Sequence, residues 1–295
     1  MASMITPTML VVILLLCGLD YASMFQVLDL THDLSAKTLY WPGNPSYNFT
    51  ELARGQMDNF WYESNFIATA EHGGTHVDSP AHFYEGGWRT QQIPMERLTG
   101  PGVVIDVKDK ARDNPDYRVL LNDITEWESV NGRIPDNAAV IMNSGWGAKY
   151  PNKTAVFGTE TPSVPSTFHF PAWHQDTVTW LINQRHVYMI GVDTPSTDFG
   201  QSSTFPTHVV LSKHNVVGLE NVANLDTIPV SGTRIFAAVT KIKDGSGGPA
   251  RIFATISTED EKCTNSGPLR LPLSVLSLIC VGVATIMFMY HDEQI

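Results

Sequence analysis

The sequence predicts a single domain of mixed α/β or α+β class, for two reasons. Short β-branched segments bounded by Gly, Pro or Asn recur along the chain, and segments with helical periodicity lie between some of them. Their order does not follow strict strand-helix-strand alternation, so a purely parallel sheet is not expected. About one domain's worth of the 295 residues remains when an apolar segment at each end is set aside.

Seven segments have the composition of strands, because they are rich in β-branched residues and end at turn-forming residues. They are residues 25–30, 66–70, 102–107, 138–142, 187–192, 234–239 and 251–256. Helical patterns occupy residues 122–130, 174–184 and 208–214. Asn122 is the expected N-cap of the first helix, since its side chain can accept a hydrogen bond from the first turn.

Residues 72–83 are the most informative stretch and run His-Gly-Gly-Thr-His-Val-Asp-Ser-Pro-Ala-His-Phe. The three histidines and the aspartate are His72, His76, Asp78 and His82. All four occupy even positions, so an extended segment places their side chains on one face. Neutral imidazole and carboxylate are ligands that zinc or manganese prefers, and no cysteine lies nearby to form a closed thiolate site. The cluster therefore predicts half of a metal site.

This stretch resembles the signature of the metal-dependent cyclase family, which includes bacterial-type kynurenine formamidases and isatin hydrolases. Other blocks of the chain are similar to the family pattern and occur in the same order. They are residues 29–32 and 40–45, Ser144-Gly145-Trp146, residues 191–198, and His208 with Glu220 twelve residues later. The resemblance covers most of residues 24–256 and implies the family's compact swivelling β/β/α fold as a single domain.

The resemblance also implies a centre with two divalent metal ions, with Zn²⁺ expected first and Mn²⁺ second. The ligands it implies are His72, His76 and Asp78 for one ion, and Asp78, His208 and Glu220 for the other. His82 matches the family's proton-transfer histidine and not a ligand. The family resemblance further implies a homodimer.

Three aromatic residues flank the matched blocks, namely Trp41, Phe83 and Trp146. They either form an apolar wall for a planar aromatic substrate or belong to the core.

The expected function is metal-dependent hydrolysis of a carbon-nitrogen amide bond. An aryl formamide such as N-formylkynurenine is the first expected substrate, and a cyclic amide such as isatin is the second. Divalent ions polarise carbonyls and lower the pKa of water to about 7, and an imidazole such as that of His82 suits proton transfer near neutrality. Two alternatives stay open: a non-catalytic surface binding module on the same fold, and a metallohydrolase acting on a lactone or ester. The formal charge of -11 argues against a nucleic-acid partner.

The two ends of the chain predict a secretory route. Residues 1–23 contain an apolar run at residues 9–19 and resemble a signal peptide, with an uncleaved anchor as the alternative. A polar linker at residues 257–270 leads to residues 271–290, which have the length of a membrane span or of a lipid-anchor signal, and to a tail at residues 291–295. We therefore expect residues 24–256 to be membrane-anchored on the extracellular face of the plasma membrane.

Two glycosylation sequons, at Asn48 and Asn152, agree with that route. Cys263 is the one cysteine outside the apolar end segments, so no internal disulfide is expected in the domain. It either pairs between chains or stays unpaired.

Overall fold

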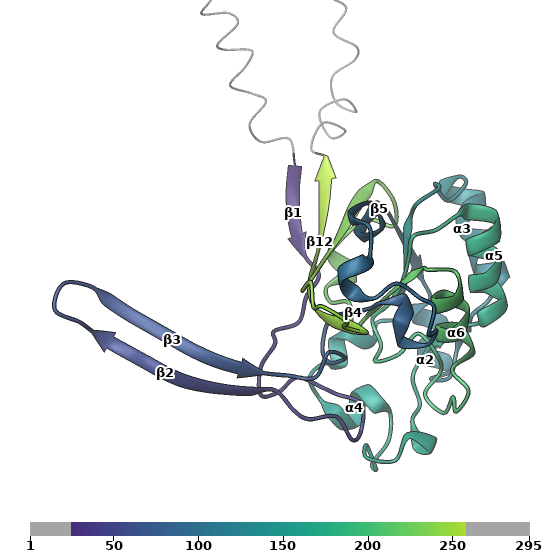
Figure 1. Cartoon of the computed structure of the whole chain (residues 1–295). Coiled ribbons are helices and arrows are strands. Elements are labelled where there is room, and N and C mark those ends of the chain that lie inside the picture. Colours follow the sequence, from purple (N-terminus) through teal and green to yellow (C-terminus); the bar gives the residue numbers. More distant parts are fainter. Residues whose placement is uncertain (1–24, 258–295) are drawn as a thin grey trace, which may run out of the picture. The chain divides into compact units, whose positions relative to one another are not determined.

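The computed structural model describes residues 25–257, and Phe25–Ile256 form one compact unit (Figure 1). The described strands are β1 (Phe25–Asp29), β2 (Asn48–Gln56), β3 (Trp61–Ala68), β4 (His76–Asp78), β5 (Thr99–Asp106), β6 (Arg118–Val119), β7 (Ala139–Asn143), β8 (Ala172–Trp173), β9 (Met189–Val192), β10 (Val217–Glu220), β11 (Thr233–Val239) and β12 (Gly247–Ser257). The described α-helices are α2 (Lys108–Asp113), α3 (Leu121–Asn131), α4 (Lys153–Phe157), α5 (Gln175–Arg185) and α6 (Pro206–Lys213). The predicted signal peptide at residues 1–23 and the predicted anchor at residues 271–290 lie outside the described residues. Cys263, for which pairing between chains was one alternative, also lies outside them.

Eight strands form one sheet in the order β1-β12-β11-β5-β7-β9-β10-β4. Strands β5, β7, β9 and β10 run parallel, whereas β4, β11 and β12 pair in antiparallel fashion. Because β4 pairs with both β10 and β12, the strands close into a barrel-like circuit. Strand β4, which carries part of the predicted metal site, therefore has a hydrogen-bonded neighbour on each edge.

Two apolar clusters lie on the two faces of the central strands, as the two-residue period of a strand requires. In β5, Val104 belongs to one cluster, while Val103 and Ile105 belong to the other. The second cluster includes Ile124 of α3 and Leu181 of α5, and Figure 1 shows these helices side by side on that face. The burial of both faces explains why these strands have continuous apolar sequences.

The strands predicted at residues 102–107 and 138–142 coincide with β5 and β7 to within a few residues, and the helix at residues 174–184 coincides with α5. The segment predicted at residues 66–70 covers only the end of β3, β4 was expected only as part of a longer extended segment, and β2 and β10 were not predicted. Strands β4 and β10 are too short to show a period of their own, and β2 mixes charged, polar and apolar residues.

The N-cap predicted at Asn122 is wrong. Helix α3 begins at Leu121 after the N-cap Leu120, so Asn122 lies inside the first turn. The carboxylate that closes this end belongs to Asp123, whose Oδ2 accepts a hydrogen bond from the Leu120 backbone N–H at 2.7 Å. An acidic side chain in the third helical position can reach back in this way, and Asp123 does so here.

The extended segment expected for residues 72–82 is limited to β4. His72 precedes the strand in a bend, and His82 ends the short 3-10 helix Pro80–His82. Ser79 is extended, with φ −80° and ψ 153°, as a residue before proline prefers. The chain therefore presents this cluster from a bend, a strand and a turn, and not from one continuous strand.

Among the residues that the structure describes, no helix has both the length and the apolar character needed to cross a membrane.

Candidate metal centre and active site

Strands β4 and β10 bring His76, Asp78 and Glu220 together. Their antiparallel register places His76 opposite Glu220 and Asp78 opposite Gly218. Directly opposite residues point to the same face of a sheet, so His76 and Glu220 become neighbours. Gly218 leaves room for the aspartate, because a Cβ at this position would lie 3.1 Å from the Cβ of Asp78.

Helix α6 presents His208 to the same place. The Asp198 carboxylate accepts hydrogen bonds from the backbone N–H groups of Thr207 and His208, at 2.9 and 3.1 Å. A negative charge at the first turn of a helix is favourable. The same carboxylate accepts a hydrogen bond from His208 Nδ1 at 2.7 Å, which fixes the ring with Nε2 toward Asp78 and Glu220.

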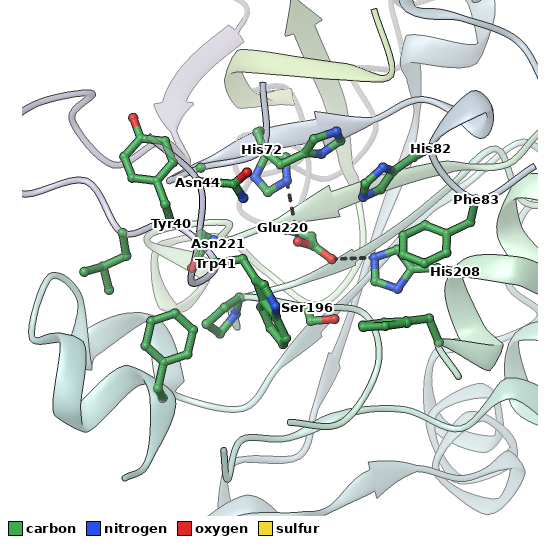
Figure 2. Close-up of a pocket in the computed structure, with 16 residues that line it drawn as sticks. Tyr40, Trp41, Asn44, His72, His82, Phe83, Ser196, His208, Glu220 and Asn221 are labelled. Carbon is green, nitrogen blue, oxygen red and sulfur yellow. Dashed lines mark ion pairs between the residues drawn. The ribbon is translucent and has the colours of Figure 1, made fainter. Parts of the chain in front are cut away.

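The structure brings all five predicted ligands together, and Figure 2 shows Glu220 and His208 pointing toward one another. His76 Nε2 lies 3.2 Å from Asp78 Oδ1 and 3.5 Å from Glu220 Oε2. His208 Nε2 lies 3.3 Å from Asp78 Oδ2 and 3.1 Å from Glu220 Oε1. His72 Nδ1 is 2.6 Å from Asp78 Oδ1. Two buried carboxylates thus lie among three imidazoles.

Each imidazole is held by a hydrogen bond from its outer nitrogen. His76 Nδ1 donates to the Gly74 carbonyl at 2.9 Å, and His208 Nδ1 donates to Asp198. His72 Nε2 lies 2.9 Å from Ser246 Oγ, and that hydroxyl donates its one proton to Glu71 at 2.6 Å. Ser246 can therefore only accept from His72, which places the His72 proton on Nε2.

The consequence is that three unprotonated ring nitrogens face two carboxylates. Lone pairs and negative charges that face one another repel unless a cation or a proton lies between them. Two of the atoms involved, His76 Nε2 and Asp78 Oδ2, are buried without a hydrogen-bond partner. A buried polar atom without a partner is costly, so the donor set fits a divalent cation.

The pKa shifts of His76 and Asp78 also reflect the strong attraction between imidazole and carboxylate in this cluster. Burial alone lowers the pKa of His76, but the charges of Asp78 and Glu220 raise it to about 9. Burial works to raise the pKa of Asp78, but the imidazoles of His76, His208 and His72 hold it well below its usual value. The site therefore attracts positive charge.

His82 lies beside the predicted ligands. Its ring stacks on that of His72, with 3.8 Å between ring centroids and 16° between ring planes. Burial, reinforced by the neighbouring imidazoles, lowers the pKa of His82 to about 3, although Asp78 acts in the opposite direction. The ring is therefore neutral at pH 7.

Among the described residues, two groups have ligand atoms close enough to share one ion. They are His72, Asp78 and His82, and His76, Asp78 and Glu220. Asp78 belongs to both groups. The partition differs from the predicted one, because His76 lies with Glu220 and His82 lies with His72.

The cluster lies at one side of a cavity of about 220 Å³. The aromatic residues that line it are Tyr40, Trp41, Phe83, Phe157 and Phe205. The polar residues that line it outside the metal cluster include Asn44, Ser196 and Asn221. Figure 2 shows Trp41 and Phe83 on the same cavity as Glu220 and His208, so an aromatic substrate can lie against these rings next to the metal cluster.

The prediction that Trp146 contacts substrate is corrected. Trp146 is not among the residues that line the cavity, and only 5% of its surface is exposed. Its indole N–H donates to the Val156 carbonyl at 2.8 Å, and its ring packs in a cluster with Phe157. Trp146 therefore belongs to the buried cluster that it forms with Phe157, Phe168 and Phe170.

Several residues of the site were not identified from the sequence. Asp198 lies in a matched block, and its position before a predicted helix could have identified it as the partner of His208. Ser246 and Glu71 are 175 positions apart in the sequence, and no local pattern connects them. Phe157 ends α4 and Phe205 is the N-cap of α6, and both reach the cavity only through tertiary packing.

The chain is similar to known proteins over most of its length. The family model described as “Putative cyclase” matches residues 28–199. An isatin hydrolase of Roseibium aggregatum is 28% identical over 239 residues, which cover 78% of this chain and 86% of the relative. A kynurenine formamidase of Salinibacter ruber is 26% identical over 230 residues, which cover 76% of this chain and 95% of the relative.

The solved structure of isatin hydrolase A from Ralstonia solanacearum has 32% sequence identity and a TM-score of 0.73, and the match covers 87% of this chain and 100% of that one. This chain therefore belongs to the cyclase family. The predicted family and the predicted mixed α/β fold are confirmed. The relatives are named as hydrolases, which supports the prediction of an enzyme and not the alternative of a non-catalytic module.

The predicted membrane-anchored extracellular location is wrong. No helix of the described residues can cross a membrane, and the isatin hydrolase and kynurenine formamidase relatives give no support for an anchored protein. The prediction depended mainly on the apolar composition of the two end segments, which lie outside the described residues. Asn48 and Asn152 are both exposed, but their predicted glycosylation depended on the same route and is not retained.

Proposed function

We propose that this protein is a metal-dependent amidohydrolase that cleaves the bond between a carbonyl carbon and an aryl nitrogen. The observation that carries the proposal is the buried cluster of imidazoles and carboxylates beside an aromatic-lined cavity. The named activities of the relatives, on isatin and on N-formylkynurenine, support it. Both of those compounds contain an aryl nitrogen bound to a carbonyl, so one arrangement of groups serves both reactions.

The proposed centre holds two divalent ions that share Asp78. The other proposed ligands are His72, His76, His208 and Glu220. Imidazole and carboxylate donors without thiolate suit Zn²⁺ first and Mn²⁺ second. When bound, such ions polarise the substrate carbonyl and lower the pKa of water.

His82 is proposed to move the proton. Water adds to the carbonyl carbon, the carbon-nitrogen bond breaks, and the aryl nitrogen leaves with a proton. The neutral ring of His82 can accept the proton of the water and return it to that nitrogen. Burial lowers the pKa of His82 to about 3, so the ring is neutral at pH 7 and an unprotonated ring nitrogen is available to accept that proton.

The cavity favours a neutral aryl amide. Among the described residues that line it, none is a lysine or an arginine. N-formylkynurenine carries a carboxylate and an ammonium group, and a carboxylate buried without a cationic partner is costly. Isatin carries neither charge. The proposed order of substrates therefore places an isatin-like cyclic amide ahead of N-formylkynurenine, the reverse of the order expected from the sequence.

Trp41 and Phe83 are proposed as contacts for the aromatic ring of the substrate, together with Phe157 and Phe205. The ring of Phe83 lies 4.5 Å from that of His82 and 4.5 Å from that of His208, measured between centroids. A substrate ring placed against Phe83 therefore lies within reach of both the proton-transfer residue and the metal cluster.

Steady-state kinetics of the purified chain with isatin, formanilide and N-formylkynurenine test the proposal. Formanilide and N-formylkynurenine share the reacting bond and differ in the charged side chain. We expect kcat/KM to be about 100-fold lower for N-formylkynurenine than for formanilide, because its charges lack partners. Higher activity on N-formylkynurenine overturns the preference for neutral substrates, and no turnover of any of the three by fully metallated protein overturns the amidohydrolase assignment.

Elemental analysis of the same preparation tests the metal count independently of the substrate. Two ions per chain are expected. An active preparation with a single ion per chain contradicts the sharing of Asp78.

A further inference from the structure

Asn221 lies in the wall of the cavity and directly follows Glu220 in the sequence. Figure 2 shows both residues at this cavity. The asparagine is almost enclosed, with 4% of its surface exposed. No step of the proposed hydrolysis uses it. Buried polar groups are nearly always hydrogen-bonded, so the partners of this side chain indicate what the cavity binds.

The orientation of the Asn221 amide group is fixed by Gly74. Asn221 Nδ2 donates a hydrogen bond to the Gly74 carbonyl at 3.0 Å. The same carbonyl accepts the hydrogen bond from His76 Nδ1 at 2.9 Å. A carbonyl oxygen has two lone pairs and no proton, so it can accept both bonds and only the NH₂ end of the asparagine can face it. The side chain is therefore tied to the same backbone group as a proposed metal ligand.

The other end of this amide, Asn221 Oδ1, has no partner in the part of the chain that the structure describes. It is not enclosed, unlike His76 Nε2 and Asp78 Oδ2, which are buried without a partner. The open space that Asn221 lines is the cavity. An amide oxygen only accepts hydrogen bonds, so a ligand in the cavity must supply an N–H or O–H donor to satisfy it.

The backbone at Asn221 offers a different reason for an asparagine here. Its φ of +50° is in the left-handed region, where asparagine is enriched among residues other than glycine. Its N–H donates to the Thr194 carbonyl at 3.0 Å, and its carbonyl accepts from Thr75 Oγ1 at 2.6 Å. Asn224 has a similar φ of +55°, but it is exposed and lies outside the cavity. The two asparagines therefore allow backbone conformation to be tested separately from ligand binding.

The other uncharged polar side chains of the described wall are less suited to this role. Ser196 Oγ accepts a hydrogen bond from the Asp198 backbone N–H at 3.1 Å, so its own proton is left as a donor. The Tyr40 hydroxyl is already hydrogen-bonded. Asn44 is exposed, so water competes with a ligand for its amide. Asn221 Oδ1 combines a fixed direction, burial and a free lone pair.

We propose that Asn221 Oδ1 accepts a hydrogen bond from the N–H of the scissile amide and thereby selects cyclic amides with an unsubstituted nitrogen. This inference rests on the proposed amidohydrolase function. Asn221 follows Glu220 and shares the Gly74 carbonyl with His76, so the acceptor adjoins the metal cluster. A cyclic amide holds its carbonyl oxygen and its N–H on the same edge, whereas the trans form usual in open chains directs them oppositely. A lactam can therefore address the cluster and Asn221 together.

The same contact disfavours a lactone. A lactone has a ring oxygen in place of the N–H, so its lone pairs would face Asn221 Oδ1 without a proton between them. An N-methyl lactam also lacks the donor and places a methyl group against the oxygen. A site built to hydrogen-bond a substrate group discriminates strongly against an analogue without that group, because its own polar atom is left unpaired.

Kinetics of the metallated full chain with isatin and N-methylisatin at pH 7 test the proposal. Each kcat/KM is divided by the uncatalysed rate of that compound, which removes the difference in intrinsic reactivity. We expect the wild type to prefer isatin by about 100-fold and Asn221→Gly to prefer it by less than about 5-fold. Glycine is chosen because it adopts the left-handed conformation without strain. Asn224→Gly and Asn44→Ala are the matched controls, and both are expected to keep the wild-type preference.

Equal use of both compounds by the wild type, or an unchanged preference in Asn221→Gly, overturns the proposal while leaving amide hydrolysis intact. Loss of the preference in Asn44→Ala overturns it as well. If neither compound is hydrolysed, the proposed function fails, and quenching of tryptophan fluorescence decides the inference separately. Isatin must then bind more tightly than N-methylisatin to the wild type and not to Asn221→Gly, and equal binding to the wild type overturns the inference.

Asn221→Asp replaces the glycine variant if that variant does not fold. Aspartate also tolerates the left-handed conformation and keeps an acceptor oxygen. Retention of the preference for isatin in this variant supports the contact with the substrate N–H, and its loss overturns the proposal.

Discussion

The metal cluster and the aromatic wall belong to one cavity but are supported differently. Four of the five proposed ligands stand on β4, β10 and α6, His72 precedes β4, and hydrogen bonds hold the outer nitrogens of His72, His76 and His208. The wall comes from loops and helix ends, where rings such as Trp41 and Phe157 meet edge to face at 6.3 Å between centroids. The proposed ligands are thus held mainly by the closed sheet, whereas the aromatic residues proposed to contact substrate lie on segments that can change without moving those ligands.

The largest effect is expected from Asp78→Ala, which removes the residue shared by both ligand groups. Metal and activity should be lost together, with turnover falling more than about 10³-fold, because even a change outside the first ligands costs about 10- to 100-fold. Elemental analysis and kinetics measure both losses. Asp226→Ala is the matched control, since this carboxylate is exposed and pairs with Lys108. Retention of both metals in Asp78→Ala contradicts the shared ligand.

His82→Ala separates proton transfer from metal binding. The five proposed ligands remain, so the metals should stay, while kcat should fall by about 10²- to 10⁴-fold with little change in KM. His214→Ala, at an exposed histidine, is expected to change neither quantity. Loss of metal in His82→Ala would make His82 a ligand, in agreement with its position beside His72 and Asp78. Near-full turnover would rule out the proton-transfer role.

Ser246→Ala tests whether metal affinity depends on the hydrogen bond between His72 Nε2 and the Ser246 hydroxyl. Without this hydroxyl, His72 Nε2 loses the acceptor that fixes its proton, so metal affinity should fall by about 10- to 100-fold. A metal titration measures the affinity, and excess metal should restore kcat. The control is Ser129→Ala on the exposed side of α3. Unchanged affinity in Ser246→Ala means that packing alone orients His72.

The smallest effect is expected at the wall. Trp41→Leu should raise KM for isatin by about 10-fold and leave metal content and kcat nearly unchanged, because it removes an aromatic contact but no ligand. Trp146→Phe is the comparison, since Trp146 lies behind the wall and should affect the melting temperature more than KM. A large loss of metal in Trp41→Leu would show that wall and cluster are not independent.

The parts of the site that were predictable from the sequence are the local ones. His72, His76 and Asp78 lie within seven residues, so their chemistry is visible before any fold is known. His208 and Glu220 were assigned only through the family resemblance, because nothing near them in the sequence indicates a metal. Their meeting with Asp78 depends on the pairing of β4 with β10 and on the position of α6.

The fold was predictable where strands are buried on both faces and continuous in their apolar residues, as β5 and β7 are. It was not predictable at β4, which has three residues, or at β2, where Glu51 and Arg54 interrupt the apolar pattern. Trp146 was misassigned because a large aromatic residue has the same sequence signal in a cavity wall and in a core.

The pairing of β4 on both edges affects how a metal ion bound in the cluster would escape to water. A strand at the rim of an open sheet can separate locally at low cost, but β4 is hydrogen-bonded to β10 and to β12. Strand separation at β4 is therefore not a low-cost route out of the site, and bound ions would have to leave through the adjoining cavity. A small chelator should strip the protein quickly and a bulky one slowly, and mild denaturant should change neither rate until the domain itself unfolds.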